Sequence, residues 1–196
     1  MFQVRIHGRG GQGVVTGAEM LSVAAFLEDQ WAQAFPSFGS ERMGAPVMAF
    51  CRIDQKEIRS REPITDPDAL VIQDPTLLHL KSTWEGLSAR GYVIINSARA
   101  ISDLGISDHT RQLPEDHVFA APATELALKH VGRPVPNAAL LGALAAVSGC
   151  LRLESVEAAI RHKFPGKVGE NNIEAARAAH AMAVNALAGP GVGAHA

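Results

Sequence analysis

Residues 2–17 read FQVRIHGRGGQGVVTG, and this stretch decides the fold. Apolar and polar residues alternate over residues 2–7, which is the pattern of a half-buried β-strand. A glycine-rich turn follows at residues 8–13, and residues 14–27 then place apolar side chains at helical spacing. A strand, a glycine turn and a helix in this order predict the opening of a βαβ unit.

The turn matches the pattern G-x-G-x-x-G in the place where that pattern binds ligands, after a strand and before a helix. Glycine permits positive φ angles and lets backbone amides approach a phosphate, and the helix N-terminus adds free N–H groups and a positive dipole end. The candidate binding residues are Gly8, Gly10, Gly11, Gln12, Gly13 and Thr16. Arg9 is expected to add a cationic donor. The alternative is that the glycines only allow tight packing of the strand against the helix.

Two common nucleotide sites do not fit the turn. A dinucleotide fold ends its second strand with an acidic residue about 20 residues after the motif. Here the second expected strand ends near Phe35, and Glu28 and Asp29 come too early. No Gly-Lys-Ser/Thr follows the turn, as a P-loop requires. The sequence therefore argues against a standard NAD site and against a P-loop.

A second loop, residues 36–46, is dense in glycine, proline and polar residues. We expect it to leave the carboxyl edge of the second strand beside the glycine turn, which is where ligands bind in such sheets. Its candidate ligand contacts are Ser37, Phe38, Gly39 and Arg42. The alternative is a structural loop whose charged side chains are solvated.

The rest of the chain predicts an α/β fold, a single Rossmann-like domain with a mainly parallel sheet and extra C-terminal helices. The apolar runs at 69–72 and 92–95 indicate strands buried on both faces. Further strands are expected at 31–35, 47–53 and 118–121, with 57–60 pairing back onto the third, a short helix or turn at 77–84, and helices at 123–130, 137–149, 154–164 and 173–187. The domain is assigned to residues 1–188 and a flexible tail to 189–196. Asn137 is expected to cap its helix.

Composition excludes several function classes. The net charge of −2 and the aromatic content of 5% argue against a nucleic-acid partner. Residues 138–147, the longest apolar stretch, are too short to span a membrane, and with no signal peptide expected the cytoplasm is the expected compartment. The histidines lack metal-ligand spacing, so no metal site is expected, and His7 is interpreted as a packing residue. Asp74, before a proline, is interpreted as a turn residue.

The chain has two cysteines, Cys51 and Cys150, and neither lies in a CxxC pair. Because an iron–sulfur cluster takes four thiolates as a rule, this chain is not expected to hold one alone. Two buried thiols are favoured over a disulfide.

The two loops together resemble the gamma subunit of pyruvate:ferredoxin oxidoreductase and other 2-oxoacid:acceptor oxidoreductases. The resemblance is carried by residues 10–16 (GGQGVVT) and 37–42 (SFGSER), and extends to 136–144 and the region from Phe164 to Ala175. One position departs from it: many members carry an arginine just before Gly44, where this chain has Met43, which puts the role of Arg42 in question.

The resemblance implies a complex that oxidatively decarboxylates a 2-oxoacid, such as pyruvate or a branched-chain or aromatic one such as phenylglyoxylate, to an acyl-CoA. It implies thiamine diphosphate and 4Fe-4S clusters on partner alpha, beta and ferredoxin-like delta subunits, with ferredoxin or NAD as the acceptor. This chain would form part of the coenzyme A side of the active site and hold no cofactor or catalytic residue alone. A free-standing phosphate- or nucleotide-binding module and a purely structural subunit remain as alternatives.

Overall fold

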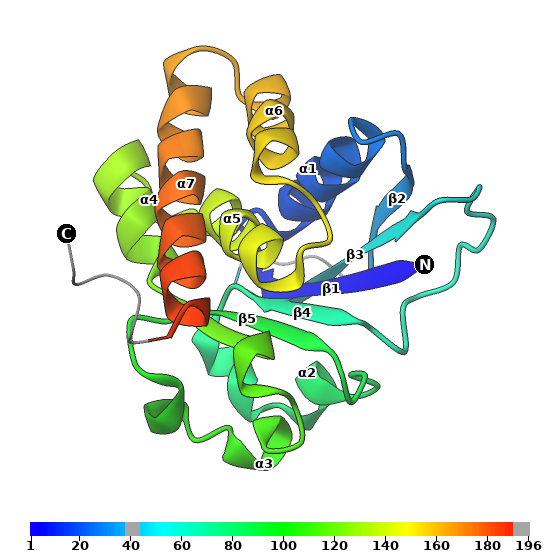
Figure 1. Cartoon of the computed structure of the whole chain (residues 1–196), viewed down its shortest axis with the longest axis vertical. Helices are drawn as coiled ribbons and strands as arrows, with labels where there is room; N and C mark the ends of the chain where they lie inside the picture. The colour runs from blue at the N-terminus through cyan, green and yellow to red at the C-terminus, as the bar shows by residue number, and fades with distance from the viewer. Residues whose placement is uncertain (38–43, 190–196) are drawn as a thin grey trace.

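The computed structural model of the chain describes residues 1–37 and 44–189 (Figure 1). The candidate residues Phe38, Gly39 and Arg42, together with Met43 and tail residues 190–196, lie outside these ranges. The strands are β1 (Phe2–Arg9), β2 (Trp31–Pro36), β3 (Pro46–Asp54), β4 (Ala69–Ile72), β5 (Tyr92–Asn96) and β6 (Val118–Ala121). The α-helices are α1 (Val14–Phe26), α2 (Lys81–Trp84), α3 (Ser107–Thr110), α4 (Ala123–Val131), α5 (Asn137–Ser148), α6 (Leu153–Lys163) and α7 (Lys167–Leu187).

The six strands form one sheet in the order β2-β3-β1-β4-β5-β6. The pairs β1–β4, β4–β5 and β5–β6 are parallel, whereas β3 is antiparallel to both β1 and β2. Every strand except β3 therefore points the same way, and the predicted mainly parallel sheet is confirmed. The carboxyl ends of β1, β2, β4, β5 and β6 consequently lie along one edge of the sheet.

The sheet has a thick face and a thin face (Figure 1). Helices α1, α4, α5, α6 and α7 cover one face, and the short helices α2 and α3 lie on the other. Val71 and Ile94 belong to the core beneath the long helices, whereas Leu70 and Val93 belong to a second core with Trp84. The two apolar strands are thus buried on both faces, as their continuous hydrophobicity predicted.

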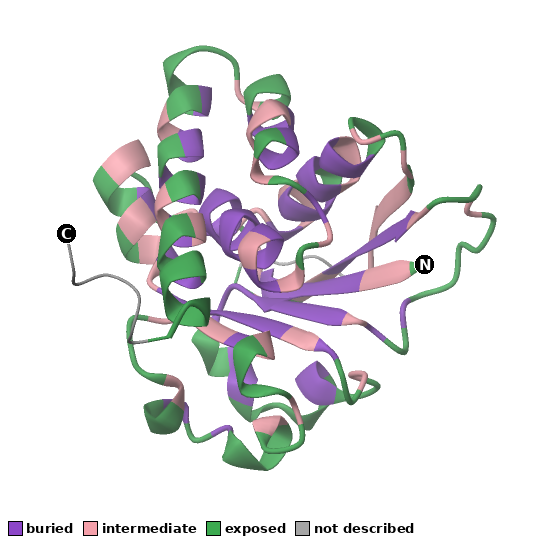
Figure 2. Ribbon diagram, in the orientation of Figure 1, coloured by how far each residue is buried: buried purple, intermediate pink, exposed green. Residues whose placement is uncertain are grey.

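Helix α5 lies at the centre of the thick face and is buried around nearly all of its surface (Figure 2). Its close contact with α7 depends on Gly142, where a Cβ atom would overlap the backbone carbonyl of Ala176. The helix ends at Gly149, whose φ of +62° is the left-handed conformation that favours glycine. The prediction of a buried, all-apolar helix is confirmed.

Three details of the fold were predicted wrongly or missed. Residues 57–60 form no strand, so the expected pairing with β3 is absent there. Helix α7 begins at Lys167 rather than at residue 173, because the turn at Gly166 precedes it. Short helical turns at Ile101–Leu104 and Glu115–His117 flank α3 and were not predicted. In the described ranges, no helix is both long enough and apolar enough to cross a bilayer.

Candidate functional site

The glycine turn connects the end of β1 to the start of α1, and glycine is needed at its positions for different physical reasons. Gly11 and Gly13 have φ angles of +93° and +73°, which side-chain-bearing residues rarely adopt. A Cβ atom on Gly8 would lie 2.6 Å from a methyl carbon of Val14, so Gly8 allows the strand to pack against the helix. At Gly11 a Cβ atom would meet nothing within 4 Å, so there glycine serves the backbone conformation alone.

Gln12 closes the turn by hydrogen bonds to Arg9. Its backbone N–H donates to the carbonyl of Arg9 at 3.0 Å, and its Oε1 accepts from the N–H of Arg9 at 2.7 Å. The N–H of Gly10 donates to the carbonyl of Ala45 at 3.0 Å. Among the described residues, none accepts a hydrogen bond from the N–H of Gly11 or Gly13. Of the turn amides expected to face a phosphate, those two therefore remain available.

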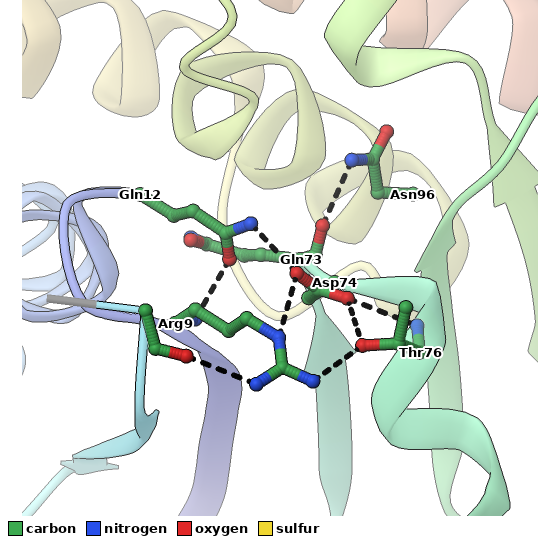
Figure 3. Close-up of polar contacts among 7 residues, drawn as sticks. Arg9, Gln12, Gln73, Asp74, Thr76 and Asn96 are labelled. Carbon is green, nitrogen blue, oxygen red and sulfur yellow. Dashed lines mark hydrogen bonds and ion pairs between the residues drawn. The ribbon is translucent and has the colours of Figure 1, made fainter.

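Arg9 is held inside the protein's own hydrogen-bond network (Figure 3). Its Nε lies 3.2 Å from Oδ2 of Asp74, and its two terminal nitrogens donate to Thr76 Oγ1 at 2.7 Å and to the carbonyl of Gly44 at 3.0 Å. Arg9 is therefore paired with Asp74, and each of its three guanidinium nitrogens has a partner within the chain. Its role as a cationic donor to a ligand stays a prediction.

Asp74 is the centre of this network and lies just beyond the carboxyl end of β4. Its Oδ1 accepts from the N–H and the hydroxyl of Thr76 at 2.9 and 2.5 Å, and its Oδ2 accepts from Nε2 of Gln12 at 2.9 Å. Burial raises the pKa of Asp74, but these hydrogen bonds and the charge of Arg9 outweigh burial and bring the pKa below its ordinary value. Asp74 is the turn residue expected before Pro75 and also the anion that joins the loop after β4 to the glycine turn.

A cleft of about 360 Å³ adjoins this network at the carboxyl ends of β4, β5 and β6. Asn96 forms part of its wall, where its Nδ2 donates to the carbonyl of Gln73 and to Thr124 Oγ1, both at 2.8 Å. The Oε1 atom of Gln73 is buried and has no hydrogen-bond partner among the described residues. The cleft is lined by Gln12, Gln73, Pro75, Asn96, Ser97, Ala98, Arg99, Pro122, Thr124 and Glu125.

Most residues of this cleft were not predicted from the sequence, although the sequence contains a pattern that indicates them. Gln73 and Asn96 are the polar residues at which the apolar runs of two buried parallel strands end. Such residues gather at one edge of the sheet, where α/β proteins bind ligands. The apolar runs predicted the strands, but the polar residue that ends each run was not interpreted as part of a binding site.

The remaining candidates occupy different places. Thr16 is half-buried in the first turn of α1, and the N–H of Ser37 donates to the carbonyl of Met48 at 2.9 Å at the end of β2. Asn137 is the first residue of α5 rather than its cap, and its Nδ2 reaches the carbonyl of Gly13 at 3.4 Å. The structure thus places α5 directly behind the glycine turn.

Histidine, cysteine and carboxylate side chains do not gather into metal-ligand sets in the described part of the chain: no three of them lie close enough to hold an ion. Both cysteines are free thiols. Burial raises the pKa of Cys51 and raises that of Cys150 to about 11.

The fold and the turn define a Rossmann-like α/β subunit with a glycine turn at the carboxyl edge of a largely parallel sheet. The sequence model of the pyruvate ferredoxin/flavodoxin oxidoreductase family matches residues 3–182. The chain belongs to this family.

Two curated relatives and one solved structure show how close the similarity is. The chain is 45% identical to the pyruvate/ketoisovalerate oxidoreductases common subunit gamma of Pyrococcus abyssi, over 91% of this chain and 95% of the relative. It is 46% identical to the pyruvate synthase subunit PorC of Methanocaldococcus jannaschii, over 92% and 96%. The crystal structure of pyruvate oxidoreductase subunit PORC from Thermotoga maritima is 35% identical, with a TM-score of 0.79, and covers 92% of this chain and 95% of that one.

Proposed function

We propose that this chain is the gamma subunit of a thiamine-diphosphate- and iron–sulfur-dependent 2-oxoacid:acceptor oxidoreductase complex that converts a 2-oxoacid to an acyl-CoA. The observation that carries the proposal is the family match over residues 3–182, together with relatives, one named as a common subunit gamma and one as pyruvate synthase subunit PorC, that are matched over nearly their whole length. Partner alpha, beta and ferredoxin-like delta subunits hold the thiamine diphosphate and the clusters. Electrons leave to ferredoxin or NAD through those subunits.

Within the complex, this chain forms part of the wall on the coenzyme A side. Two N–H groups without a partner among the described residues, those of Gly11 and Gly13, lie at the start of α1, a helix of 13 residues. Amides and a helix dipole in this arrangement suit a phosphate, and coenzyme A carries several phosphates. Coenzyme A supplies the thiol that receives the acyl group. The part of this chain is to bind and orient the phosphate end.

The experiment is an anaerobic purification of the complex through a C-terminal tag on this chain, followed by turnover assays with a panel of 2-oxoacids. The proposal expects several co-purifying subunits, thiamine diphosphate, the absorption of iron–sulfur clusters and oxidation that depends on coenzyme A. A colourless, solitary chain that binds nucleotides tightly would contradict it and favour the free-standing binding module.

The role of the turn has its own test. Gly11→Leu is expected to abolish turnover, because the side chain enters the open space beside the two amides. The matched control is Gly105→Leu, since Gly105 is also exposed, has a φ of +67° and has nothing within 4 Å of a Cβ position. Both variants place a leucine at a positive φ, so thermal unfolding of each is measured beside turnover. A loss of turnover in Gly11→Leu that exceeds any loss of stability reports on the site.

A purely structural turn is the second candidate, and one observation favours it. The side chains of Arg9 and Gln12 are directed to partners within the chain rather than to an open site. This alternative predicts that the Gly11→Leu complex assembles and turns over as the Gly105→Leu complex does.

A further inference from the structure

Three loops meet at the carboxyl edge of the sheet, and one side chain contacts all of them. The glycine turn follows β1, Gly44 precedes β3, and Asp74 follows β4 (Figure 3). Arg9 is the last residue of β1, where the glycine turn begins, and it binds the other two loops through Gly44, Asp74 and Thr76. No other described side chain joins the same three segments.

The backbone contacts at this point are few. The N–H of Gly10 bonds to the carbonyl of Ala45 at 3.0 Å, and the N–H of Gly44 bonds to the carbonyl of Gly10 at 3.4 Å. A 3.4 Å contact is a weak hydrogen bond. Arg9 adds charge-assisted bonds to the same junction, and the ion pair with Asp74 is sheltered, since the side chains are 33% and 12% exposed.

We propose that Arg9 is a positioning residue, whose guanidinium fixes Gly44 and Asp74 against the glycine turn and so holds the N–H groups of Gly11 and Gly13 in their binding arrangement. This inference rests on the proposed function, because it assigns these amides to the phosphate end of coenzyme A. Arg9 acts through the turn and does not touch the ligand.

Lysine cannot replace arginine in this arrangement. An ammonium group is a point charge that keeps the pair with Asp74, whereas the planar fork of arginine also reaches Thr76 and Gly44 at once. Arg9→Lys and Arg9→Ala should therefore both loosen the turn. If the turn binds and does no chemistry, the loss falls on KM for coenzyme A and leaves kcat nearly unchanged.

The test is kinetics on the purified complex carrying Arg9→Ala, Arg9→Lys or the control Arg177→Ala. Arg177 pairs with Glu157, which is 13% exposed, but does so on α7, away from the turn. We expect KM for coenzyme A to rise roughly tenfold in both Arg9 variants. Added guanidinium ion should lower it again in Arg9→Ala, and Arg177→Ala should keep the wild-type KM. An unchanged KM in the Arg9 variants, or an equal rise in Arg177→Ala, overturns the inference.

Amide hydrogen exchange of the same complexes separates this inference from the proposed function. Exchange at the hydrogen-bonded amides of Gly10 and Gln12 should rise in the Arg9 variants while exchange in α7 stays at the wild-type level. If the wild-type complex shows no dependence on coenzyme A, the proposed function fails, and faster exchange still supports a turn held by Arg9. Unchanged exchange at Gly10 and Gln12 overturns the positioning role, whether or not the wild-type complex depends on coenzyme A.

Discussion

Nε of Arg5 donates a hydrogen bond of 2.9 Å to Nε2 of His7, and both side chains are buried on the same face of β1. The guanidinium also donates to the carbonyls of Thr83 and Glu85, at 3.0 and 2.7 Å, and so ties α2 to the sheet. Because His7 accepts at Nε2, it must be neutral. Burial and the nearby Arg5 charge lower the pKa of His7 to about 3.

This pair predicts how stability depends on pH. Unfolded histidine has a pKa of about 6.5, so between that pH and about 3 the unfolded chain binds a proton that the folded chain does not. The contribution of His7 is fully present above pH 6.5 and is lost as pH falls, by up to about 1.4 kcal/mol per pH unit. Urea unfolding between pH 7.5 and 4.5, followed by tryptophan fluorescence, measures this slope.

The control for this slope is a pair of substitutions. His7→Gln keeps an acceptor for Arg5 but cannot titrate, so its unfolding free energy should depend less on pH than that of the wild type. His162→Gln removes an exposed histidine from α6 and should keep the wild-type slope. Equal slopes in all three proteins would show that His7 is not the group responsible.

The fold was predictable wherever burial leaves a strong periodic signal. The two apolar strands and α5 are surrounded by other elements, so their sequences are apolar throughout and identify them. The direction of β3 was not predictable, because the sequence of a largely buried strand looks the same whether its neighbours are parallel or antiparallel. The helical turns around α3 carry no such signal, since none of the residues of α3 is buried.

The position of the candidate site in the fold could be predicted from the sequence, but the contacts of its side chains could not. The order of strand, turn and helix located the glycine turn, because φ angles of this kind require glycine at Gly11 and Gly13. The partners of Arg9 come from residues 35 to 67 positions away along the chain. Contacts between residues so far apart along the chain leave no pattern in the local sequence. The ion pair between Arg9 and Asp74 could therefore be identified only from the structure.

Gly142 and Gly17 give a second prediction, because both are helical glycines with different surroundings. Gly142→Ala should lower the free energy of unfolding by about 1–3 kcal/mol, since the new methyl group overlaps the carbonyl of Ala176 and forces α5 and α7 apart. Gly17→Ala should be neutral or stabilising, because its Cβ would lie 3.5 Å or more from its neighbours and alanine favours the helix. Thermal unfolding of both variants checks the difference, and equal loss in the two would contradict it.

The thiols give a third prediction. Burial raises the pKa of Cys51 and of Cys150, so at neutral pH both are protonated and poor nucleophiles. Native protein should therefore react slowly with iodoacetamide, and protein in denaturant should be labelled at both positions. Peptide mass spectrometry locates the label, and fast labelling of Cys51 in native protein would show that β3 opens.

Gln12→Glu gives the last prediction, because it changes one hydrogen-bond donor and almost nothing else. Nε2 of Gln12 donates to Asp74, so a carboxylate in its place sets two negative charges 2.9 Å apart and should destabilise the protein by about 1–3 kcal/mol at pH 7. The pKa of Asp74 is lowered in the wild type, so the new carboxyl is the one that takes up a proton as pH falls. Protonated Glu donates as Gln does, and the destabilisation should therefore shrink between pH 7 and pH 4.5. Thermal unfolding at the two pH values measures this change in destabilisation, and Gln55→Glu at an exposed position is the control. If Gln12→Glu destabilises the protein equally at both pH values, the hydrogen bond that Gln12 donates to Asp74 is not its contribution to stability.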